Sequence, residues 1–373
     1  MTLLPSVCFV GYGNLPILAS GFDSVQTGGE EVQQSLLAKA LARRGYRVST
    51  VVGDFGQRDG QQWHGVNTYK SYAPGEGLPV LRFLHPRWTG LWSALKRANA
   101  DVYYVSPAGA QLGQVALFAS AHHRRVIFRS AHDANCSPDT LMIRYWRDRK
   151  LYEYGLRRAD VVLAQTTIQQ RLLRDNYQLN SRIAVMMVDA AERDVPFERR
   201  DVDILWVNNL RRFKRPDLFV DLARQLPGAR MHMVGGPSPG FEDVHQDLLI
   251  RLSATAHLTY HGRIPYHAVN TLYERARVFV NTSDTEGFPN SYLQAWVRGV
   301  PVVAFFDPDG VIRREGLGVA AASLDEMRAA VERLLNDPGH WAETSARCRQ
   351  YMQTHYDEER ILAPYLEAIA GTS

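Results

Sequence analysis

Short apolar segments alternate with helical segments along most of this chain, and the alternation begins again near residue 202. Short runs rich in Val, Ile and aromatic residues are typical of buried strands, whereas apolar residues three or four positions apart indicate helices. In the first half, predicted strands span residues 6–11, 48–52, 101–105, 126–129, 161–165 and 182–187, and predicted helices span 30–44, 139–158 and 167–176. In the second half, predicted strands span 202–207, 231–235, 258–261, 278–281 and 301–305, and predicted helices span 216–226, 242–254, 290–298 and 323–336.

This repeated order predicts an α/β fold with two Rossmann-like domains that face each other across a cleft. Continuous apolar strands between helices indicate parallel sheets covered on both faces, and 373 residues suit two such domains. We expect an N-terminal domain at 1–190 and a C-terminal domain at 196–354, with a linker at 188–201. The helix at about 355–373 is expected to pack back on the first domain. Ligands should bind at the carboxyl ends of the strands.

Composition and charge exclude several classes of protein. No apolar stretch approaches the roughly 18–20 residues of a membrane span, and the start lacks the basic and apolar regions of a signal peptide. Three widely spaced cysteines (Cys8, Cys136 and Cys348) argue against a disulfide framework or a cysteine zinc site, so we expect a cytoplasmic protein.

The two halves of the chain differ in charge. Residues 1–195 hold 23 Lys and Arg against 16 Asp and Glu, and the remainder holds 20 against 23. The basic half therefore suits an anionic partner. No nucleic-acid motif accompanies it, so we expect no nucleic-acid partner.

Two glycine-containing loops follow the first predicted strand. Residues 11–16 contain G-x-G without a third glycine, and no helix is predicted directly after them, so a plain loop is favoured over a dinucleotide fingerprint. Gly28 and Gly29, after Thr27, directly precede a predicted helix. Their amides could receive a phosphate or a polar substrate group, and a plain helix entry is the alternative.

A run of cations lies between a strand and a helix of the second half. Arg211, Arg212, Lys214 and Arg215 occupy four of five positions before Pro216, which suits the first turn of a helix. Because α/β domains bind ligands at this end of the sheet, the run predicts a diphosphate site rather than a merely solvated surface.

A second polar loop follows the predicted strand at 278–281. Glu286 and Gln294 are eight positions apart and could hold two parts of one extended ligand, and Gly287 lets the backbone approach that ligand closely. Amides near Asn290 are expected to point outward at the helix start. The alternative is a capped helix with the Asn290 side chain as its cap.

Two further polar sites are weaker. His132 lies in a polar loop after the strand at 126–129 and could touch substrate, although a structural histidine is the alternative. Asp307 and Asp309 spell D-x-D, but Pro308 and Gly310 favour a turn over a metal pair.

Tryptophan, leucine and arginine gather in two segments of the basic half, at 81–97 and 143–150. Such a mixture suits a membrane interface. The alternative is that these aromatic side chains pack in the core of the N-terminal domain.

The second half resembles the family 4 glycosyltransferases, which have the GT-B fold of two Rossmann-like domains. The N-terminal half is similar more loosely, through Gly28-Gly29 and His132-Asp133. The resemblance rests chiefly on His261-Gly262-Arg263-Ile264, Leu272-Tyr273-Glu274-Arg275-Ala276, Val278-Phe279-Val280-Asn281-Thr282-Ser283, Glu286-Gly287-Phe288-Pro289-Asn290 and Gly299-Val300-Pro301-Val302-Val303.

The resemblance implies a retaining transfer of sugar from a nucleotide-diphosphate sugar, with no metal or other cofactor. Lys214 would pair with the diphosphate, and Glu286 would contact the sugar as the first residue of a Glu-x7-Glu pattern. His132 would face the sugar from the other domain, which would bind the acceptor. The other residues that we expect to contact the donor, from their place in these loops and motifs, are Gly28, Gly29, Arg211, Arg212, Arg215, Arg263, Ile264, Gly287, Phe288, Pro289, Asn290 and Gln294.

Two positions depart from the family's pattern. Gln294 replaces its second Glu, so its hydrogen bond to a ribose would lack charge assistance. Asn209 stands where the family often has Arg, and Arg211, Arg212 or Arg215 could supply the missing guanidinium.

The sequence therefore predicts a glycosyltransferase that acts on a glycan or lipid-linked acceptor in surface polysaccharide or glycolipid assembly. It would be cytoplasmic, with a possible peripheral contact with an anionic membrane. A nucleotide-sugar epimerase of similar fold and a non-catalytic sugar-nucleotide- or glycan-binding module are the alternatives.

Overall fold

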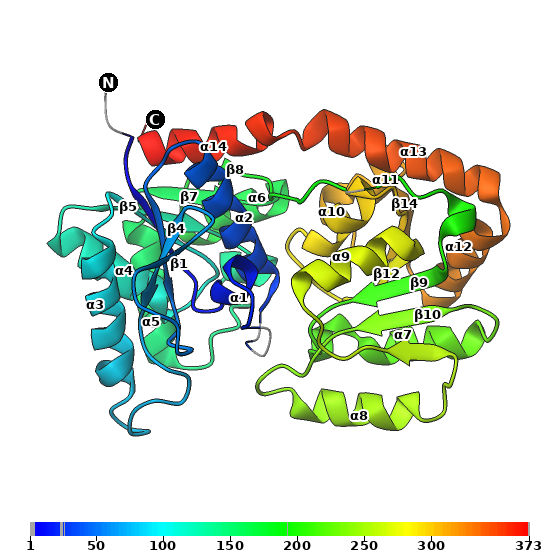
Figure 1. Cartoon of the computed structure of the whole chain (residues 1–373), viewed down its shortest axis with the longest axis horizontal. Coiled ribbons are helices and arrows are strands. Elements are labelled where there is room, and N and C mark those ends of the chain that lie inside the picture. Colours follow the sequence, from blue (N-terminus) through cyan, green and yellow to red (C-terminus); the bar gives the residue numbers. More distant parts are fainter. Residues whose placement is uncertain (1–3, 23–24, 26, 192, 372–373) are drawn as a thin grey trace. The chain divides into compact units, whose positions relative to one another are not determined.

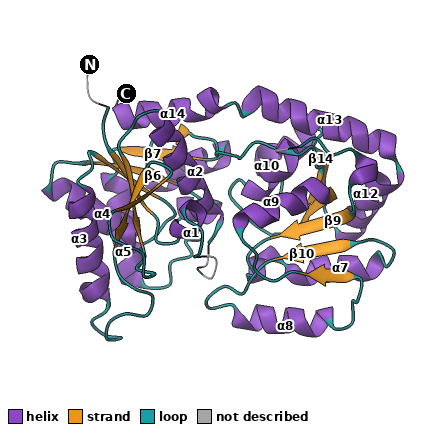
Figure 2. Ribbon diagram, in the orientation of Figure 1, coloured by secondary structure: helices purple, strands orange, loops and turns teal. Residues whose placement is uncertain are grey.

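The computed structural model of the chain describes residues 4–22, 25, 27–191 and 193–371, and these divide into two compact units. Unit 1 comprises Met1–Met187 and Glu358–Ser373, and unit 2 comprises Val188–Asp357. In each unit a sheet is covered by helices (Figures 1 and 2). The sequence predicted this mixed α/β class with two parallel-sheet domains, and the structure confirms it. The expectation that the chain begins without a signal peptide involves residues 1–3, which lie outside the described residues.

The sheet of unit 1 has the strand order β3-β4-β2-β1-β5-β6-β7-β8 among the described residues. All neighbouring strands are parallel except β3 and β4, which form an antiparallel hairpin at one edge. The elements are β1 (Val7–Val10), α1 (Leu15–Leu18), α2 (Gly29–Arg43), β2 (Val48–Val52), β3 (Gln61–Trp63), β4 (Val66–Lys70), α3 (Thr89–Ala98), β5 (Val102–Val105), α4 (Ala110–Ala121), β6 (Arg125–Arg129), α5 (Trp146–Arg158), β7 (Val161–Ala164), α6 (Thr167–Tyr177), β8 (Arg182–Ile183) and α14 (Glu358–Ala370).

The core of unit 1 is continuous from the strands to helices α3, α4 and α5. Helices α4 and α5 pack closely because two glycines meet there: a Cβ at Gly113 would lie 2.2 Å from the carbonyl oxygen of Leu151, and one at Gly155 would lie 2.6 Å from the amide of Gly113. The C-terminal helix α14 belongs to the same unit, where the Tyr365 hydroxyl donates to the carbonyl of Val185 (2.8 Å).

Three predictions for unit 1 are wrong in detail. A short helix, α1, does follow the G-x-G loop. Helix α5 begins at Trp146 rather than at 139, because Leu141 is buried while Met142 is exposed, an alternation typical of extended chain. The strand predicted at 182–187 ends at Ile183, and the amide of Ala184 makes one more hydrogen bond to the end of β7, at Ala164 (2.8 Å). Beyond it, the carbonyls of Val185 and Met187 accept from the side chains of Tyr365 and Gln33 instead of from a strand.

The sheet of unit 2 is parallel, with the strand order β11-β10-β9-β12-β13-β14 among the described residues. Helices α7, α8 and α12 contribute to its core, as does Trp341 of α13, and α10 packs on both α9 and α13. The elements are β9 (Val202–Val207), α7 (Pro216–Gln225), β10 (Met231–Val234), α8 (Glu242–Leu252), β11 (Leu258–Tyr260), α9 (Tyr266–Arg275), β12 (Ala276–Asn281), α10 (Asn290–Val297), β13 (Val302–Ala304), α11 (Val311–Glu315), β14 (Gly318–Ala320), α12 (Leu324–Asn336) and α13 (Pro338–His355).

The segment expected to be a linker, 188–201, is part of unit 2. Its Arg200 is buried and donates to the carbonyl oxygens of Ala276 (2.6 Å) and Arg298 (2.8 Å). An exposed linker would leave these carbonyls to water, so this segment is fixed to the unit that follows it. Among the described residues, no helix has both the length and the apolar character needed to cross a bilayer.

Candidate active site

The cationic loop of unit 2 joins β9 to α7, as predicted. Arg212–Lys214 form one turn of 3-10 helix, and Arg215 then takes the left-handed backbone conformation (φ 49°) before Pro216 opens α7. A β-carbon makes this conformation costly unless surrounding contacts hold it. The loop is therefore held in a defined shape rather than left as an open basic surface.

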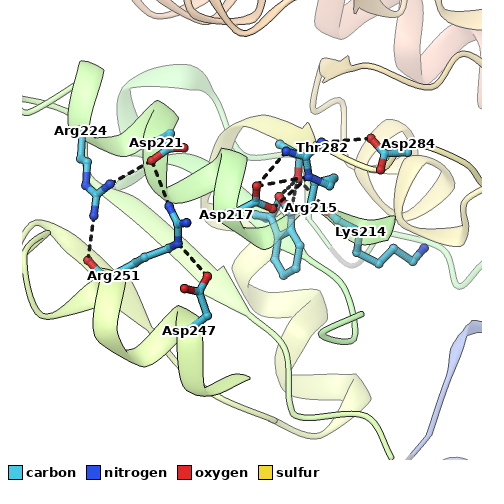
Figure 3. A network of polar contacts seen from close by, with 10 residues as sticks. Lys214, Arg215, Asp217, Asp221, Arg224, Asp247, Arg251, Thr282 and Asp284 are labelled. Atoms are coloured by element: carbon cyan, nitrogen blue, oxygen red, sulfur yellow. Dashed lines mark hydrogen bonds and ion pairs between the residues drawn. The ribbon is translucent and has the colours of Figure 1, made fainter. Parts of the chain in front are cut away.

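Thr282 supplies much of that restraint (Figure 3). It directly follows β12 and is fully buried, and its single O–H is shared between the carbonyl oxygens of Lys214 (2.9 Å) and Arg215 (2.8 Å). Its oxygen accepts a hydrogen bond from the indole Nε1 of Trp206 on β9 (3.0 Å). The amide of Asp284 donates to the carbonyl of Phe213 (2.8 Å). The loops that follow β9 and β12 are thus joined through their backbones.

Lys214 and Glu286 form an ion pair between these two loops. The Lys214 ammonium lies 2.5 Å from both carboxylate oxygens of Glu286, and the two side chains are only 14% and 8% exposed. The Asn281 side-chain amide donates to the same carboxylate at 3.5 Å. A buried pair of this kind adds little net stability, because desolvation offsets the attraction between the charges. The pair lies at the carboxyl ends of β9 and β12, the edge at which parallel α/β sheets bind ligands.

The three arginines of the loop differ in their contacts. Arg215 donates to Asp217 (2.8 Å) and lies 3.5 Å from Asp284, and these acceptors raise its pKa. Arg212 is exposed and pairs with Asp243 (2.5 Å). The Nε atom of Arg211 is buried without a hydrogen-bond partner among the described residues. Of these three guanidiniums, Arg211 retains a buried donor that a ligand could use.

The loop after Glu286 leads directly into α10. Gly287 and Pro289 are buried, and the Phe288 ring packs edge-on against Trp296 (6.2 Å between centroids). The helix begins at Asn290, with Pro289 at the N-cap and no side-chain cap. The alternative that the Asn290 side chain caps this helix is therefore wrong, since Asn290 is already the first helical residue.

Gln294 lies in the second turn of α10 and is mostly buried. It lies near the phenol of Tyr266, as do Asp189 and Asn270. Burial raises the pKa of the Tyr266 phenol, and the Asp189 carboxylate raises it further, so this phenol stays protonated at neutral pH. Gln294 therefore lies among other polar side chains of unit 2.

Arg263 and Ile264 follow β11 in the same unit. Arg263 is exposed, and its guanidinium donates to the carbonyl of Pro237 (2.9 Å). Gly235, after β10, lies so close to the neighbouring chain that a Cβ would be 2.1 Å from the carbonyl oxygen of Asn208. The backbones that follow β9, β10 and β11 therefore converge at the carboxyl edge of the sheet.

In unit 1, Gly28 and Gly29 open helix α2 as predicted. The amide of Gly28 donates to the Glu31 carboxylate (2.9 Å), so one of the amides proposed for a ligand already has a partner. Glu30, in the same turn, pairs with the guanidinium of Arg129 at 3.0 Å. Because Arg129 ends β6 three residues before His132, this pair brings the glycine loop and the histidine loop together.

His132 lies in a polar turn after β6. Its Nδ1 accepts from the amide of Ala134 (3.0 Å), and the Asn135 side chain accepts from the amides of Ala131 (3.2 Å) and His132 (3.1 Å). The hydrogen bond to Nδ1 places the proton of a neutral imidazole on Nε2. The ring is thereby fixed in one tautomer.

Sequence reasoning missed Thr282, Tyr266 and the pair Arg129–Glu30. A single threonine after a strand carries no signal of its own, and Tyr266 is one of 17 tyrosines. Arg129 and Glu30 are 99 positions apart, so only the packed fold joins them. The D-x-D motif forms the predicted turn, and Asp307 accepts from the amide of Ile312 (2.8 Å) at the start of α11. Among the described residues no three His, Cys, Asp or Glu side chains form a group that could hold a metal ion.

Replacing Thr282 with valine should destabilise unit 2 by about 1–3 kcal/mol, because the buried indole N–H of Trp206 and two carbonyls lose their partner. Thr282→Ser keeps the hydroxyl and should lose much less. Thermal unfolding of the two variants measures the difference. Equal midpoints for valine and serine would mean that the hydroxyl does not hold the loop.

Two family descriptions match this chain. Residues 28–189 match "Glycosyl transferase 4-like domain", and residues 201–337 match "Glycosyl transferases group 1". A D-inositol 3-phosphate glycosyltransferase from Mycobacteroides abscessus is 32% identical over 104 residues, which are 27% of this chain. The matched part spans 24% of that relative's length.

Solved structures share the fold over 76% to 99% of this chain. Sucrose-phosphate synthase from Thermosynechococcus elongatus has a TM-score of 0.76 at 16% identity and covers 97% of both chains. Anabaena HepE in complex with UDP-glucose has a TM-score of 0.72 at 15% identity and covers 99% of both chains. Staphylococcus aureus TarM in complex with UDP and glycan ligands has a TM-score of 0.63 at 15% identity, covering 76% of this chain and 59% of that one.

At these identities the structural likeness concerns the fold alone, and the sequence matches supply the family. The two matched regions lie one in each unit, in the order that the sequence resemblance implied. The chain therefore belongs to the family 4 glycosyltransferases of GT-B fold.

Proposed function

We propose that this protein is a retaining glycosyltransferase that moves a sugar from a nucleotide-diphosphate sugar to a glycan or lipid-linked acceptor. The observation that carries the proposal is the buried pair of Lys214 and Glu286 at the carboxyl ends of β9 and β12. Parallel α/β sheets bind their ligands at this edge. A cation beside a carboxylate offers one group for a diphosphate and one for sugar hydroxyls.

The chemistry of the transfer fits these two side chains. As the bond between the anomeric carbon and the diphosphate breaks, positive charge develops on the sugar and negative charge on the leaving phosphate. The Lys214 ammonium stabilises the leaving phosphate, and the fixed, mostly buried position of this cation makes the stabilisation effective. The leaving phosphate takes the proton of the acceptor hydroxyl on the same face of the sugar, which retains the anomeric configuration.

We propose further donor contacts in unit 2. The amides of Gly287, Phe288 and Asn290 would bind sugar hydroxyls, and Arg211 offers a guanidinium for the diphosphate. The positive charge of Lys214 and Arg211 does the work that a metal ion would do, so we propose a metal-independent reaction. For Gly28, Gly29 and His132, contacts with sugar or phosphate remain proposals from the sequence.

Proteins of similar structure support the proposal that the donor is a nucleotide sugar. HepE binds UDP and UDP-glucose, and TarM binds UDP together with glycan ligands. For this chain we propose the same class of donor, a role in surface polysaccharide or glycolipid assembly, and a cytoplasmic location with peripheral contact at an anionic membrane.

A nucleoside diphosphate that binds the folded protein should raise its melting point. At a ligand concentration of 100 times Kd the gain is about 2.7 kcal/mol. A thermal-shift screen of UDP, GDP, ADP and dTDP, with and without an attached sugar, measures this gain. If none of these ligands shifts the melting point at millimolar concentration, the donor class is wrong.

An acceptor screen then separates the reaction types. A transferase forms product only when an acceptor is added, whereas an epimerase changes the donor without one. Tight donor binding with no product in either case would identify a binding module.

A further inference from the structure

Exposed apolar side chains are concentrated in two segments of unit 1. Large apolar side chains normally lie inside a protein, and a contiguous exposed group of them marks an interaction surface. Seven large apolar residues in these two segments are 53% to 91% exposed. We call the surface formed by residues 78–88 and 141–147 the apolar–basic patch. Its exposed apolar residues are Leu78, Val80, Leu81, Leu84, Met142, Tyr145 and Trp146.

The two segments are distant in sequence but meet in the structure. The guanidinium of Arg147 lies over the ring of Phe83, 3.4 Å from its centroid, and that ring packs edge-on against Trp88 (5.6 Å). A cation over an aromatic ring is an attractive contact, so it holds the segments together. Phe83 lies between Leu81 and Leu84 in the chain, and Arg147 follows Trp146. The exposed side chains on both segments therefore flank one contact.

Buried residues next to both segments anchor the patch to the core of unit 1. Helix α3 directly follows the first segment and buries Leu91 and Leu95. In the second segment, Leu141 is buried while Met142 and Arg144 are exposed. The sequence alternative that these aromatic residues all pack in the core is therefore wrong for Tyr145 and Trp146, although it holds for Trp92, which packs on Phe118.

The charge of the patch has one sign. Its residues include four arginines, Arg82, Arg87, Arg144 and Arg147, and neither an Asp nor a Glu. Arg147 pairs with Asp148 just outside the patch (2.9 Å), which leaves Arg82, Arg87 and Arg144 as its net positive charge. A surface of apolar and aromatic side chains edged by cations complements a bilayer that carries anionic headgroups: the apolar groups enter the interface and the guanidiniums stay with the phosphates.

We infer that the apolar–basic patch docks unit 1 on the surface of an anionic lipid bilayer. The inference extends the proposed function, because a protein held at a bilayer would meet a lipid-linked acceptor. Binding to vesicles nevertheless requires no sugar transfer, so the two proposals can fail separately. The protein could transfer sugar to a soluble acceptor without binding vesicles, or bind vesicles without transferring sugar.

Co-flotation of the full chain with vesicles tests the docking. The vesicles contain phosphatidylcholine alone or phosphatidylcholine with phosphatidylglycerol. We expect flotation with the anionic vesicles at an ionic strength of about 0.01 M and its loss at about 1 M, where the Debye length falls to about 3 Å. Equal flotation with neutral vesicles, or none with anionic vesicles at low salt, would refute an electrostatic docking.

Variants then locate the surface. Removal of a cation near the membrane should weaken binding about fivefold, so we expect a loss of roughly 25-fold for Arg82→Gln combined with Arg144→Gln. Trp146→Ser should also weaken it, whereas Ile250→Ser on α8, a site that is 72% exposed, is the matched control and should bind as the unchanged chain does. Flotation unaffected by the patch variants would place the membrane contact elsewhere. The other occupant that could cover the patch is a second copy of this chain, and light scattering measures whether the protein is a dimer. If the unchanged chain were a dimer that Trp146→Ser dissociates, and if it did not bind vesicles, the patch would be a contact between two copies.

Discussion

Lys214→Ala should lower the turnover of sugar transfer about 10²-fold or more. Removal of one fixed group that stabilises developing negative charge typically has an effect of this size. In this protein the ammonium is mostly buried, and Thr282 fixes the backbone that carries it. Water therefore cannot readily replace the lost charge at the leaving phosphate. Initial rates at saturating donor and acceptor measure the effect.

The lost charge must be separated from a lost fold. Lys214→Ala leaves the buried Glu286 carboxylate without its cation, which destabilises unit 2 independently of catalysis. Combining Lys214→Ala with Glu286→Gln removes that buried charge and should restore the melting point without restoring turnover. Arg224→Ala is the matched control, because Arg224 is an exposed cation on α7 of the same unit and is not among the proposed donor contacts. Near-normal turnover in a folded Lys214→Ala variant would exclude Lys214 from the mechanism.

Most strands could be predicted from the sequence because they are short runs dominated by β-branched and large apolar residues. Both Val48–Val52 and Val202–Val207 have the predicted bounds and are buried almost throughout, although they include the polar residues Ser49, Thr50 and Asp203. The hairpin β3–β4 was not predicted. Its strand Gln61–Trp63 lies at the sheet edge, is not fully buried and is polar, so it lacks the apolar pattern that identifies the inner strands.

The candidate site could be predicted where residues carry a local pattern. Lys214 stood out in a run of cations and Glu286 in a loop before a helix, and the structure brings these two side chains into contact. Local patterns could not reveal what holds them. Thr282 acts through a bond to Trp206, 76 positions away, and Tyr266 comes near Gln294 only because α9 packs on α10.

The same limit applies to Arg129, for which we expect a large loss of stability on replacement by methionine. Arg129 is fully buried, and its Nη1 donates to both carboxylate oxygens of Glu30 (3.0 and 3.1 Å). Beside it lie the phenols of Tyr104 and Tyr365, whose pKa values are raised by burial, so neither phenol carries charge. Glu30 is therefore the carboxylate that balances this buried cation.

Methionine would leave the Glu30 carboxylate, which is 10% exposed, with no cation, at a cost of about 3–5 kcal/mol. For a unit of this size that corresponds to a fall of roughly 6–20 °C in melting midpoint, which calorimetry measures. Combining Arg129→Met with Glu30→Gln removes both charges and should recover most of the loss. Arg43→Ala, which breaks an exposed pair with Glu358, is the control and should change little. If Arg129→Met had the same melting midpoint as the Arg43→Ala control, the buried ion pair would contribute little to stability. Another contact would then join the start of α2 to the loop that contains His132.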